Sequence, residues 1–440
     1  CKEEWEQLWN TVNAPQAVSL SKPVESISLS RDGRKLVVGD STGHIVVWSV
    51  DEMGKLIEQP LRRIEFGSRQ RVVAMSPDGN SVAAAGDNGK ILVWTLAGDQ
   101  PPVELKGHDS AVNTLKFADD GQRLVSGSDD RTVKLWAIAE ARVLVSQKVM
   151  YSVQCVDWSR DGKFLVAGTS SPADSSGVAY AWEVQTRDKE LELVTLRTFQ
   201  VPPEGKVKQD RGVVTIALTD DAKFAVSNGP AAELHLWRVD LSDSKDVKKL
   251  QKVNVESVKL GLHSSRVERV RSVAFSSDSS RMLAAGDDGT ITIWDRRDTD
   301  DLPTYTRSSL VLSGHGGPVR RAIPLPQSPD LIVSGSYDQN IHVWNLKTYL
   351  ESRDWLEDPS KAKSDAELEP TALVPNGTGS GVSFRSPRIG SEFRTVSRDL
   401  KTTPDPFGFQ RRDIPSHRAE FVLAIFQDAE KEVAPPNKAN

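Results

Sequence analysis

Apolar and polar residues alternate along this chain in short runs that are typical of half-buried β-strands. Residues 107–136 hold a complete set of such runs. AVNTLKF, RLVSGS and TVKLW predict three consecutive strands, and Asp-Asp-Gly at 119–121 and Asp-Asp at 129–130 predict the turns between them. Asp-Gly suits a tight hairpin because glycine accepts a positive φ freely. This stretch therefore predicts one antiparallel β-unit.

The same unit recurs along the chain, which predicts a repeat architecture. A tryptophan ends the third strand of seven units, at Trp48, Trp94, Trp136, Trp182, Trp237, Trp294 and Trp344. The second strand recurs as KLVVGD, VAAAGD, RLVSGS, FLVAGT, FAVSNG, MLAAGD and LIVSGS, and its small residues allow neighbouring backbones to approach closely. Independent local signals agree in repeat after repeat, so an all-β fold is expected.

A Gly-His opening and a terminal tryptophan about thirty residues later make residues 107–136 resemble a repeat of the WD-repeat β-propeller family. The sequence departs from the family pattern at Ala137, where an Asp usually follows the tryptophan. The resemblance implies a single propeller of four-stranded antiparallel blades. It also implies a binding function, without naming the partner.

The resemblance further implies a buried hydrogen-bonded network in two of the repeats. Asp130 can pair with one ring nitrogen of His108, and a hydroxyl, from Ser126 or Ser128, can meet the other and accept the Trp136 indole N–H. The seventh repeat holds the matching set His315, Ser334, Ser336, Asp338 and Trp344. A Ser-His-Asp set also occurs in hydrolases, but no GxSxG elbow surrounds the serine, so the structural interpretation is preferred.

The chain ends decide how the ring closes. QAVSLS at 16–21 is typical of an outer strand that lacks a blade of its own, so residues 1–23 are expected to supply a ring-closing strand. Seven repeats then fill 24–350, a degenerate eighth with insertions is expected over 351–430, and a mobile tail over 431–440. We favour eight blades, with residues 16–21 pairing near 420–427. Seven blades, closed on the strand of 341–346, are the alternative.

Composition narrows the function classes. The net charge of −5 and the pI near 5.9 argue against nucleic acid as a partner. No apolar run is long enough for a membrane helix, so we expect no transmembrane segment and a cytoplasmic location. The first residue is Cys1 rather than Met, which suggests trimming or a fragment and leaves a lipid-modified cysteine possible.

The sequence holds no Walker loop, GxGxxG or HExxH motif and no metal-ligand spacing, so neither an enzyme nor a cofactor is expected. We therefore expect a non-catalytic scaffold for protein or peptide partners. A propeller module of a longer multidomain enzyme or signalling protein is the alternative. The family's loop face suggests as candidate partner-binding residues Asp129, Tyr337, Asp287, Ser110, Asn113, Arg320 and Arg321. Changing Tyr337 or Arg320 is expected to leave stability nearly intact, because both flank the network.

Overall fold

The structure is a computed structural model with two compact units, Ala14–Arg353 and a second formed by Cys1–Asn13 with Asp354–Asn440. It describes residues 16–51, 54–57, 59–170, 177–188, 190–201, 212–228, 234–239, 269–298, 303–347, 374–375, 382–385 and 392–393.

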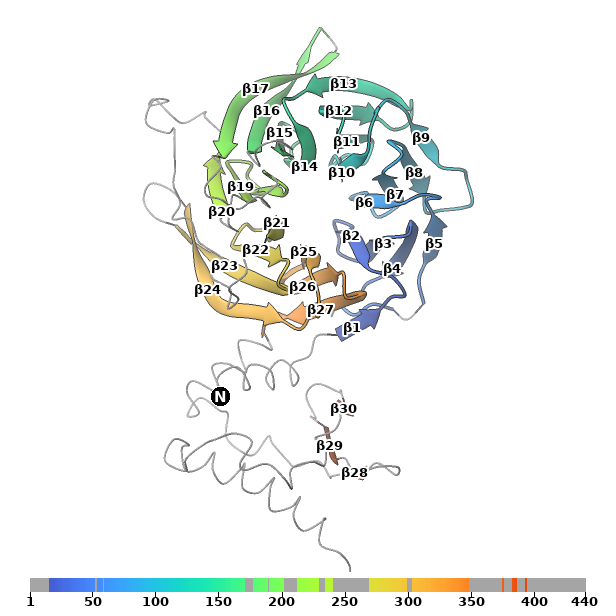
Figure 1. The fold of residues 1–440 in the computed structure, drawn as a ribbon, viewed down its shortest axis with the longest axis vertical. Helices are drawn as coiled ribbons and strands as arrows, with labels where there is room; N and C mark the ends of the chain where they lie inside the picture. The colour runs from blue at the N-terminus through green and yellow to red at the C-terminus, as the bar shows by residue number, and fades with distance from the viewer. Residues whose placement is uncertain are drawn as a thin grey trace, which may run out of the picture. The chain divides into compact units, whose positions relative to one another are not determined.

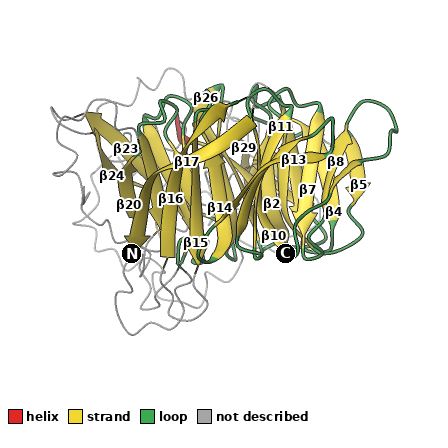
Figure 2. Cartoon of the chain, turned by 90° about the horizontal axis from the view of Figure 1, so that it is seen from above, coloured by secondary structure: helices red, strands yellow, loops and turns green. Residues whose placement is uncertain are grey.

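The first unit is a ring of seven antiparallel sheets, which we call blades one to seven (Figure 1). In each blade, strand a lies nearest the centre of the ring and strands b, c and d follow outward. Six blades have four strands, and blade five has three in the part of the chain that the structure describes. Loops lie at both ends of the strands (Figure 2), so the ring has two loop-bearing faces.

The strands follow the predicted runs closely. Blade one holds β2 (Val24–Leu29), β3 (Lys35–Asp40), β4 (His44–Ser49) and β5 (Arg62–Glu65); blade two holds β6 (Gln70–Met75), β7 (Ser81–Gly86), β8 (Ile91–Thr95) and β9 (Val103–Leu105). Blade three holds β10 (Val112–Phe117), β11 (Arg123–Ser128), β12 (Thr132–Ala137) and β13 (Arg142–Lys148); blade four holds β14 (Ser152–Trp158), β15 (Phe164–Ser170), β16 (Gly177–Arg187) and β17 (Glu190–Val201).

The remaining blades carry the longer insertions. Blade five holds β18 (Ile216–Leu218), β19 (Phe224–Asn228) and β20 (Leu234–Arg238). Blade six holds β21 (Val270–Phe275), β22 (Arg281–Gly286), β23 (Thr290–Asp298) and β24 (Pro303–Ser313). Blade seven holds β25 (Val319–Leu325), β26 (Ser328–Ser336), β27 (Asn340–Asn345) and β1 (Gln16–Ser19).

Small residues on strand b let neighbouring blades pack closely. A Cβ atom on Gly127 would lie 2.3 Å from a side-chain carbon of Val153, the first valine of the next blade's strand a. Gly168 faces Val213 in the same way, with 2.4 Å between such a Cβ and the valine side chain. Because real Cβ atoms do not approach so closely, these glycines are required by the interblade contact.

The expected eight-blade ring is wrong, because the ring closes with seven blades. β1 pairs with β27 in the register Gln16↔Val343 to Ser19↔Asn340, so the N-terminal strand is strand d of blade seven. The Ser19 hydroxyl lies 2.6 Å from Asn340 Oδ1, and Leu20 N donates to the Gln339 carbonyl at 2.7 Å. The physical reason is that the outer edge of β27 is available to β1, and pairing there completes the ring.

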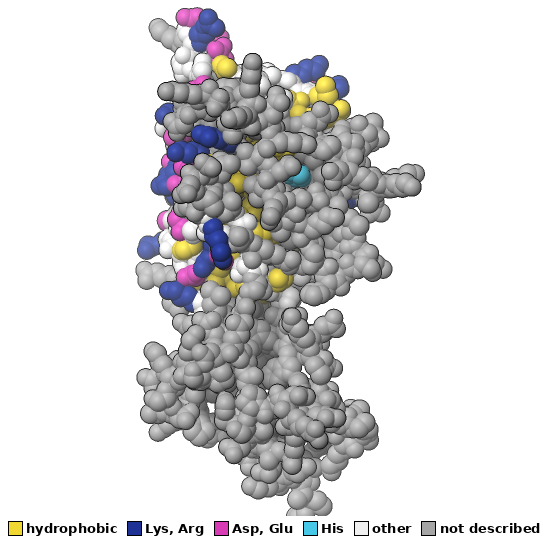
Figure 3. All heavy atoms as spheres, turned by 90° about the vertical axis from the view of Figure 1, so that its left-hand side faces the viewer, with side chains coloured by type: hydrophobic (Ala, Val, Ile, Leu, Met, Phe, Trp, Pro, Cys, Tyr) yellow, Lys and Arg dark blue, Asp and Glu magenta, His cyan; other side chains and the backbone are white. Residues whose placement is uncertain are grey.

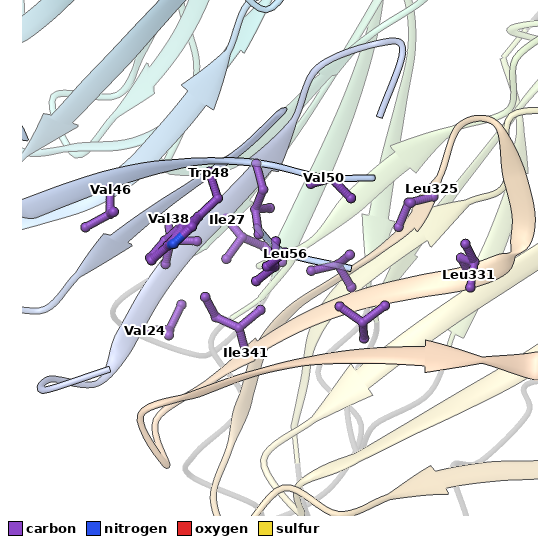
Figure 4. Packing of buried hydrophobic residues seen from close by; sticks show 13 residues of the cluster. Val24, Ile27, Val38, Val46, Trp48, Val50, Leu56, Leu325, Leu331 and Ile341 are labelled. Atoms are coloured by element: carbon purple, nitrogen blue, oxygen red, sulfur yellow. The ribbon is translucent and has the colours of Figure 1, made fainter. Parts of the chain in front are cut away.

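A hydrophobic cluster fills the interface between blades seven and one, which we call the seam (Figure 4). Val24, Ile27 and Trp48 of blade one pack in it with Leu331 and Ile341 of blade seven, and Val18 of β1 packs against the same cluster. The closing strand is therefore held by side chains as well as by backbone hydrogen bonds.

The second unit contains three short paired strands in its described residues: β28 (Val374–Pro375), β29 (Val382–Arg385) and β30 (Glu392–Phe393). They lie within residues 351–430, where a degenerate eighth repeat is expected, yet they form a sheet of their own and supply no strand to the ring sheets. The strand expected near 420–427 lies outside the described residues.

Candidate binding face

The ring face that carries the d–a loops and the b–c turns is shaped by a β-bulge in each described strand a except that of blade five. In blade one the pairing register shifts between Val24 and Ser26, so Glu25 is the extra residue. A bulge re-aims a side chain and raises the local twist. We call the extra residues the bulge residues: Glu25, Arg71, Asn113, Gln154, Arg271 and Arg320.

In blade three, His108, Asp130 and Trp136 are joined through Ser126. His108 Nδ1 lies 2.6 Å from Asp130 Oδ2, and Nε2 lies 2.6 Å from Ser126 Oγ. The Trp136 indole N–H donates to the same hydroxyl at 2.8 Å. Ser128, the other hydroxyl considered, instead accepts from the Asp130 backbone N–H at 3.1 Å. The carboxylate accepts only, so we assign the His108 proton to Nδ1.

Blade seven repeats this network with one addition. His315 lies 2.8 Å from both Asp338 Oδ2 and Ser334 Oγ, and the Trp344 N–H donates to Ser334 at 2.8 Å. Ser336 accepts from the Asp338 N–H, as Ser128 does from Asp130. His342 of β27 stacks on His315 with ring centroids 4.0 Å apart, so a second imidazole belongs to this blade's core.

The acids of both networks stay ionised. Burial alone would raise the pKa of Asp130, but hydrogen bonds from His108 and Thr132 outweigh it and hold that pKa well below its ordinary value. The pKa of Asp338 falls to about 2, because the hydrogen bond and charge of His315 outweigh its burial.

The candidate residues Asp129 and Asn113 belong to a polar cluster that links blades two and three. Asn113 Nδ2 donates to Asp129 Oδ1 at 2.7 Å, and Arg71 Nη1 contacts Asn113 Oδ1 at 2.5 Å and Asp129 Oδ2 at 3.0 Å. Arg71 Nε also pairs with Asp87 of its own blade. One arginine thus lies between two b–c turns, and its side chain stays 36% exposed.

Tyr337 and Arg320 converge on Glu25, whose side chain is only 2% exposed. Arg320 Nη2 lies 2.6 Å from Glu25 Oε2, the Tyr337 hydroxyl donates to Oε1 at 2.8 Å, and Arg69 lies 3.3 Å from the same oxygen. The Arg320 guanidinium also stands 5.0 Å from the centroid of the Tyr337 ring. Removing either side chain takes one of three partners from a buried carboxylate, so we now expect a change at Tyr337 or Arg320 to cost stability.

The other candidates lie apart from these two clusters. Asp287 is held by Arg271, with contacts of 2.5 and 2.9 Å. Ser110 offers its backbone carbonyl to the Ser128 hydroxyl at 3.2 Å. Arg321 is half-buried on β25, and it has no hydrogen bond or ion pair of its side chain with any residue the structure describes.

Sequence analysis missed Glu25, Arg69, Arg71, Asp87 and Arg271. The sequence did contain a signal for Arg71 and Arg271. When the repeats are aligned by their first strands, both arginines fall at the position of Asn113, which was already a candidate. The sequence contained no signal for the pairing of Glu25 with Arg320, since the two residues lie 295 positions apart.

Charges of both signs are interspersed on the molecule. On the side seen in Figure 3, Lys and Arg side chains lie beside Asp and Glu side chains among the described residues. Within the described part of the chain no group of three or more His, Cys, Asp or Glu could hold a metal ion. Nor is any helix there long and apolar enough to cross a membrane.

Seven antiparallel blades around a common centre, joined by loops on two faces, define a repeat β-propeller. The family model described as WD domain, G-beta repeat matches residues 60–95, 99–137, 146–177, 257–295 and 306–345. The chain belongs to the WD-repeat β-propeller family. Blades one and five lie largely outside the matched segments, and the structure nevertheless includes both in the ring.

Curated relatives share parts of this chain. WD repeat-containing protein WDS homolog of Arabidopsis thaliana is 24% identical over 307 residues, covering 62% of this chain and 54% of the relative. Apoptotic protease-activating factor 1 of Danio rerio is 23% identical over 73% of this chain and 22% of its own length. The guanine nucleotide-binding protein subunit beta of Schizosaccharomyces pombe is 33% identical over 28% of this chain and 38% of its own. The chain therefore spans about half or less of these relatives.

Proposed function

We propose that this propeller is a non-catalytic scaffold that binds protein or peptide partners on the face of the d–a loops and b–c turns. The observation that carries the proposal is the set of arginines and acids held there by mutual ion pairs while remaining partly exposed, as Arg71 is between Asp87 and Asp129. Side chains already fixed in place lose little conformational entropy when a partner binds. Tyr and Arg, both present, are enriched among interface hot spots.

The candidate contact residues remain Asp129, Tyr337, Asp287, Ser110, Asn113, Arg320 and Arg321. The name of the Schizosaccharomyces pombe relative describes a subunit of a larger protein, which supports assembly with other chains as the role of this fold. The segment similar to this chain makes up 22% of the Danio rerio relative. That partial coverage supports the second candidate, a propeller module within a longer protein.

A matched pair of charge reversals tests the face. Arg71→Glu changes the proposed binding face, whereas Arg160→Glu changes an a–b turn at the opposite end of the strands, where Arg160 pairs with Asp220 at 3.3 Å. Quantitative affinity capture from cells should lose a defined set of partners with Arg71→Glu and keep the same set with Arg160→Glu. Equal capture by both variants, with unfolding curves like that of the unaltered protein, would overturn the choice of face.

A further inference from the structure

The residue that follows the bulge residue of strand a forms a ring of equivalent positions near the centre of the propeller. In the six bulged blades it faces a small residue of strand b, as Thr114 faces Gly127 and Arg321 faces Gly335. In blade five its counterpart is Thr215, which makes the same hydrogen bond to the next blade as Thr114 does. We call this set the third-place residues: Ser26, Val72, Thr114, Cys155, Thr215, Ser272 and Arg321. Six are neutral, and only Arg321 carries a charge.

Elsewhere in the ring, three of the four third-place hydroxyls accept a backbone N–H group from the inner edge of the next blade. Ser26 Oγ accepts from Val73 N at 3.2 Å, Thr114 Oγ1 from Val156 N at 3.2 Å, and Thr215 Oγ1 from Val273 N at 2.9 Å. Strand a has a partner strand on one side only, so these side chains satisfy donors that the sheet leaves open.

Val72 and Cys155 offer no hydroxyl at their junctions, but only the junction from blade seven to blade one holds a charged donor in the third place. The corresponding N–H belongs to Ile27, which faces Val38 as Val73 faces Ala84. Its neighbour in the third place is Arg321, and a guanidinium donates hydrogen bonds but cannot accept one. The Arg321 guanidinium and the Ile27 N–H are therefore both hydrogen-bond donors, and neighbouring donors suit an anion.

Arg321 lies on β25, the strand of blade seven nearest the centre of the ring (Figure 1). It lies within electrostatic reach of Asp157 and Cys155 on β14 of blade four, on the opposite side of the ring centre (Figure 1). Burial lowers the pKa of Arg321 and the charge of Asp157 offsets this in part.

Asp157 forms no ion pair with Arg321, and both of its oxygens have other partners. Oδ1 lies 3.0 Å from Lys116 Nζ, and Oδ2 accepts from Leu218 N at 2.9 Å. The face arginines Arg69, Arg71, Arg271 and Arg320 each pair with an acid. Arg321 does not, within the described part of the chain, and it is half-buried, so part of its surface still meets solvent.

We propose that Arg321, with the Ile27 N–H beside it, is an oxyanion site at the centre of the ring that takes the carboxylate or phosphoryl group of an acidic side chain from a bound partner. The site rests on the proposed function, because the partner would reach it from the binding face. It adds a chemical requirement to that function: an anionic side chain must be presented at the ring centre.

The test uses the full chain with inorganic phosphate and two peptides as probes. Melting temperatures are followed as phosphate replaces chloride at constant ionic strength, for the unaltered protein, Arg321→Met, Arg321→Lys and the surface control Arg160→Met. We expect the apparent phosphate Kd to rise about tenfold or more in Arg321→Met, to change less in Arg321→Lys and to stay unchanged in Arg160→Met. Acetylated Gly-Ser-Glu-Ser-Gly amide should compete with phosphate, and its Gln counterpart should not.

Each outcome decides a separate point. A phosphate response equal in the unaltered protein and Arg321→Met would overturn the site. A response that depends on Arg321 but is not competed by the Glu peptide would overturn the partner side chain in favour of a free anion. Failure of the scaffold proposal is seen separately, as cellular capture that is insensitive to Arg71→Glu while the phosphate response to Arg321 persists.

Discussion

Four of the blade tryptophans show what one hydrogen bond changes. The indole N–H groups of Trp136, Trp237 and Trp344 donate to strand-b serines at 2.8 Å each. Trp294 of blade six is as fully buried as Trp136 and Trp344, but its Nε1 has no hydrogen-bond partner in the described part of the chain. The reason is local: Ala284 stands where the other three blades have Ser126, Ser227 and Ser334.

This difference predicts unequal costs for the same substitution. Trp136→Phe should lower the free energy of unfolding by about 1–2 kcal/mol more than Trp294→Phe, since only the former removes a formed hydrogen bond and leaves Ser126 with one partner fewer. Urea unfolding followed by circular dichroism measures both. In the reverse direction, Ala284→Ser should raise stability by about 1 kcal/mol by giving Trp294 an acceptor. Equal costs for the two tryptophans would contradict the account.

His342 predicts a pH dependence of its own. Burial and the neighbouring His315 lower its pKa from the ordinary 6.5 to about 4. Between these values the unfolded chain binds one proton more than the folded chain, so the free energy of unfolding falls as the pH falls from 6.5 and the loss is complete near pH 4. The total is about 3 kcal/mol. Asp130 and Asp338 act in a lower window, because their contributions are present above their ordinary value of 3.8 and are lost as the pH falls below it.

Urea unfolding at a series of pH values separates the histidine from other groups. His342→Phe keeps an aromatic ring against His315 and should remove most of the slope between pH 6.5 and 4. Leu61→Phe is the control, because Leu61 is 54% exposed and the change adds an aromatic ring without altering a titratable group, so it should leave the slope unchanged. An unaltered slope in His342→Phe would assign the acid sensitivity to other residues.

At the scale of elements, the bulges join blades that are distant in sequence. Glu25 of β2 is held by Arg320 and Tyr337 of blade seven and by Arg69 of blade two, so one buried carboxylate ties three blades together. The hydrophobic cluster around Val24 and Ile27 joins blades seven and one at the same interface through apolar contacts. The binding face and the ring seam therefore share residues.

Removing one member of this group should cost stability as well as any binding. Arg320→Met should lower the free energy of unfolding by about 1–3 kcal/mol, because it withdraws the guanidinium nearest to a buried carboxylate. Arg142→Met is the matched control, since Arg142 is 63% exposed and lies 3.8 Å from an exposed Glu140; it should change stability by about 0.5 kcal/mol or less. Adding Glu25→Gln to Arg320→Met should cost less than the sum of the two single changes. Strict additivity would show that the pair is not coupled.

Local signals made the elements predictable, and long-range pairing limited the rest. The Asp-Gly turns have the expected positive φ, for example 63° at Gly33 and 65° at Gly121, and the strand-b glycines face the next blade as their size suggests. The bulges leave one mark in the sequence, a break in the two-residue alternation, such as the step of three residues from the buried Val112 to the buried Leu115. That break does not say which residue of a neighbouring blade the bulge residue contacts. The partners of Glu25 could not be predicted, since no local pattern near residue 25 indicates a contact with residue 320.

At the scale of the whole molecule, closure depends on where one strand pairs. For QAVSLS at 16–21 the sequence left two partners open, a strand near 420–427 and the strand of 341–346, and local pattern could not choose between them. In the structure β1 pairs with β27, and Val18 packs on the seam cluster. Blade seven therefore joins the start of the ring to its end, and the ring sheets contain no strand from beyond residue 345 among those described.

The closing strand should accordingly decide whether the ring is monomeric. A chain of residues 14–353 keeps β1 and should melt within a few degrees of the full chain, whereas residues 22–353 leave the edge of β27 unpaired. The shorter chain should melt about 10 °C or more lower, or associate through that edge. Thermal melts with light scattering measure both outcomes, and a synthetic peptide of residues 14–21 should restore the monomer by strand addition. Within β1, Val18→Ser should destabilise the ring more than Ala17→Ser, because Val18 packs on the seam and Ala17 is exposed. A stable, monomeric ring of residues 22–353 would show that blade seven does not need its fourth strand.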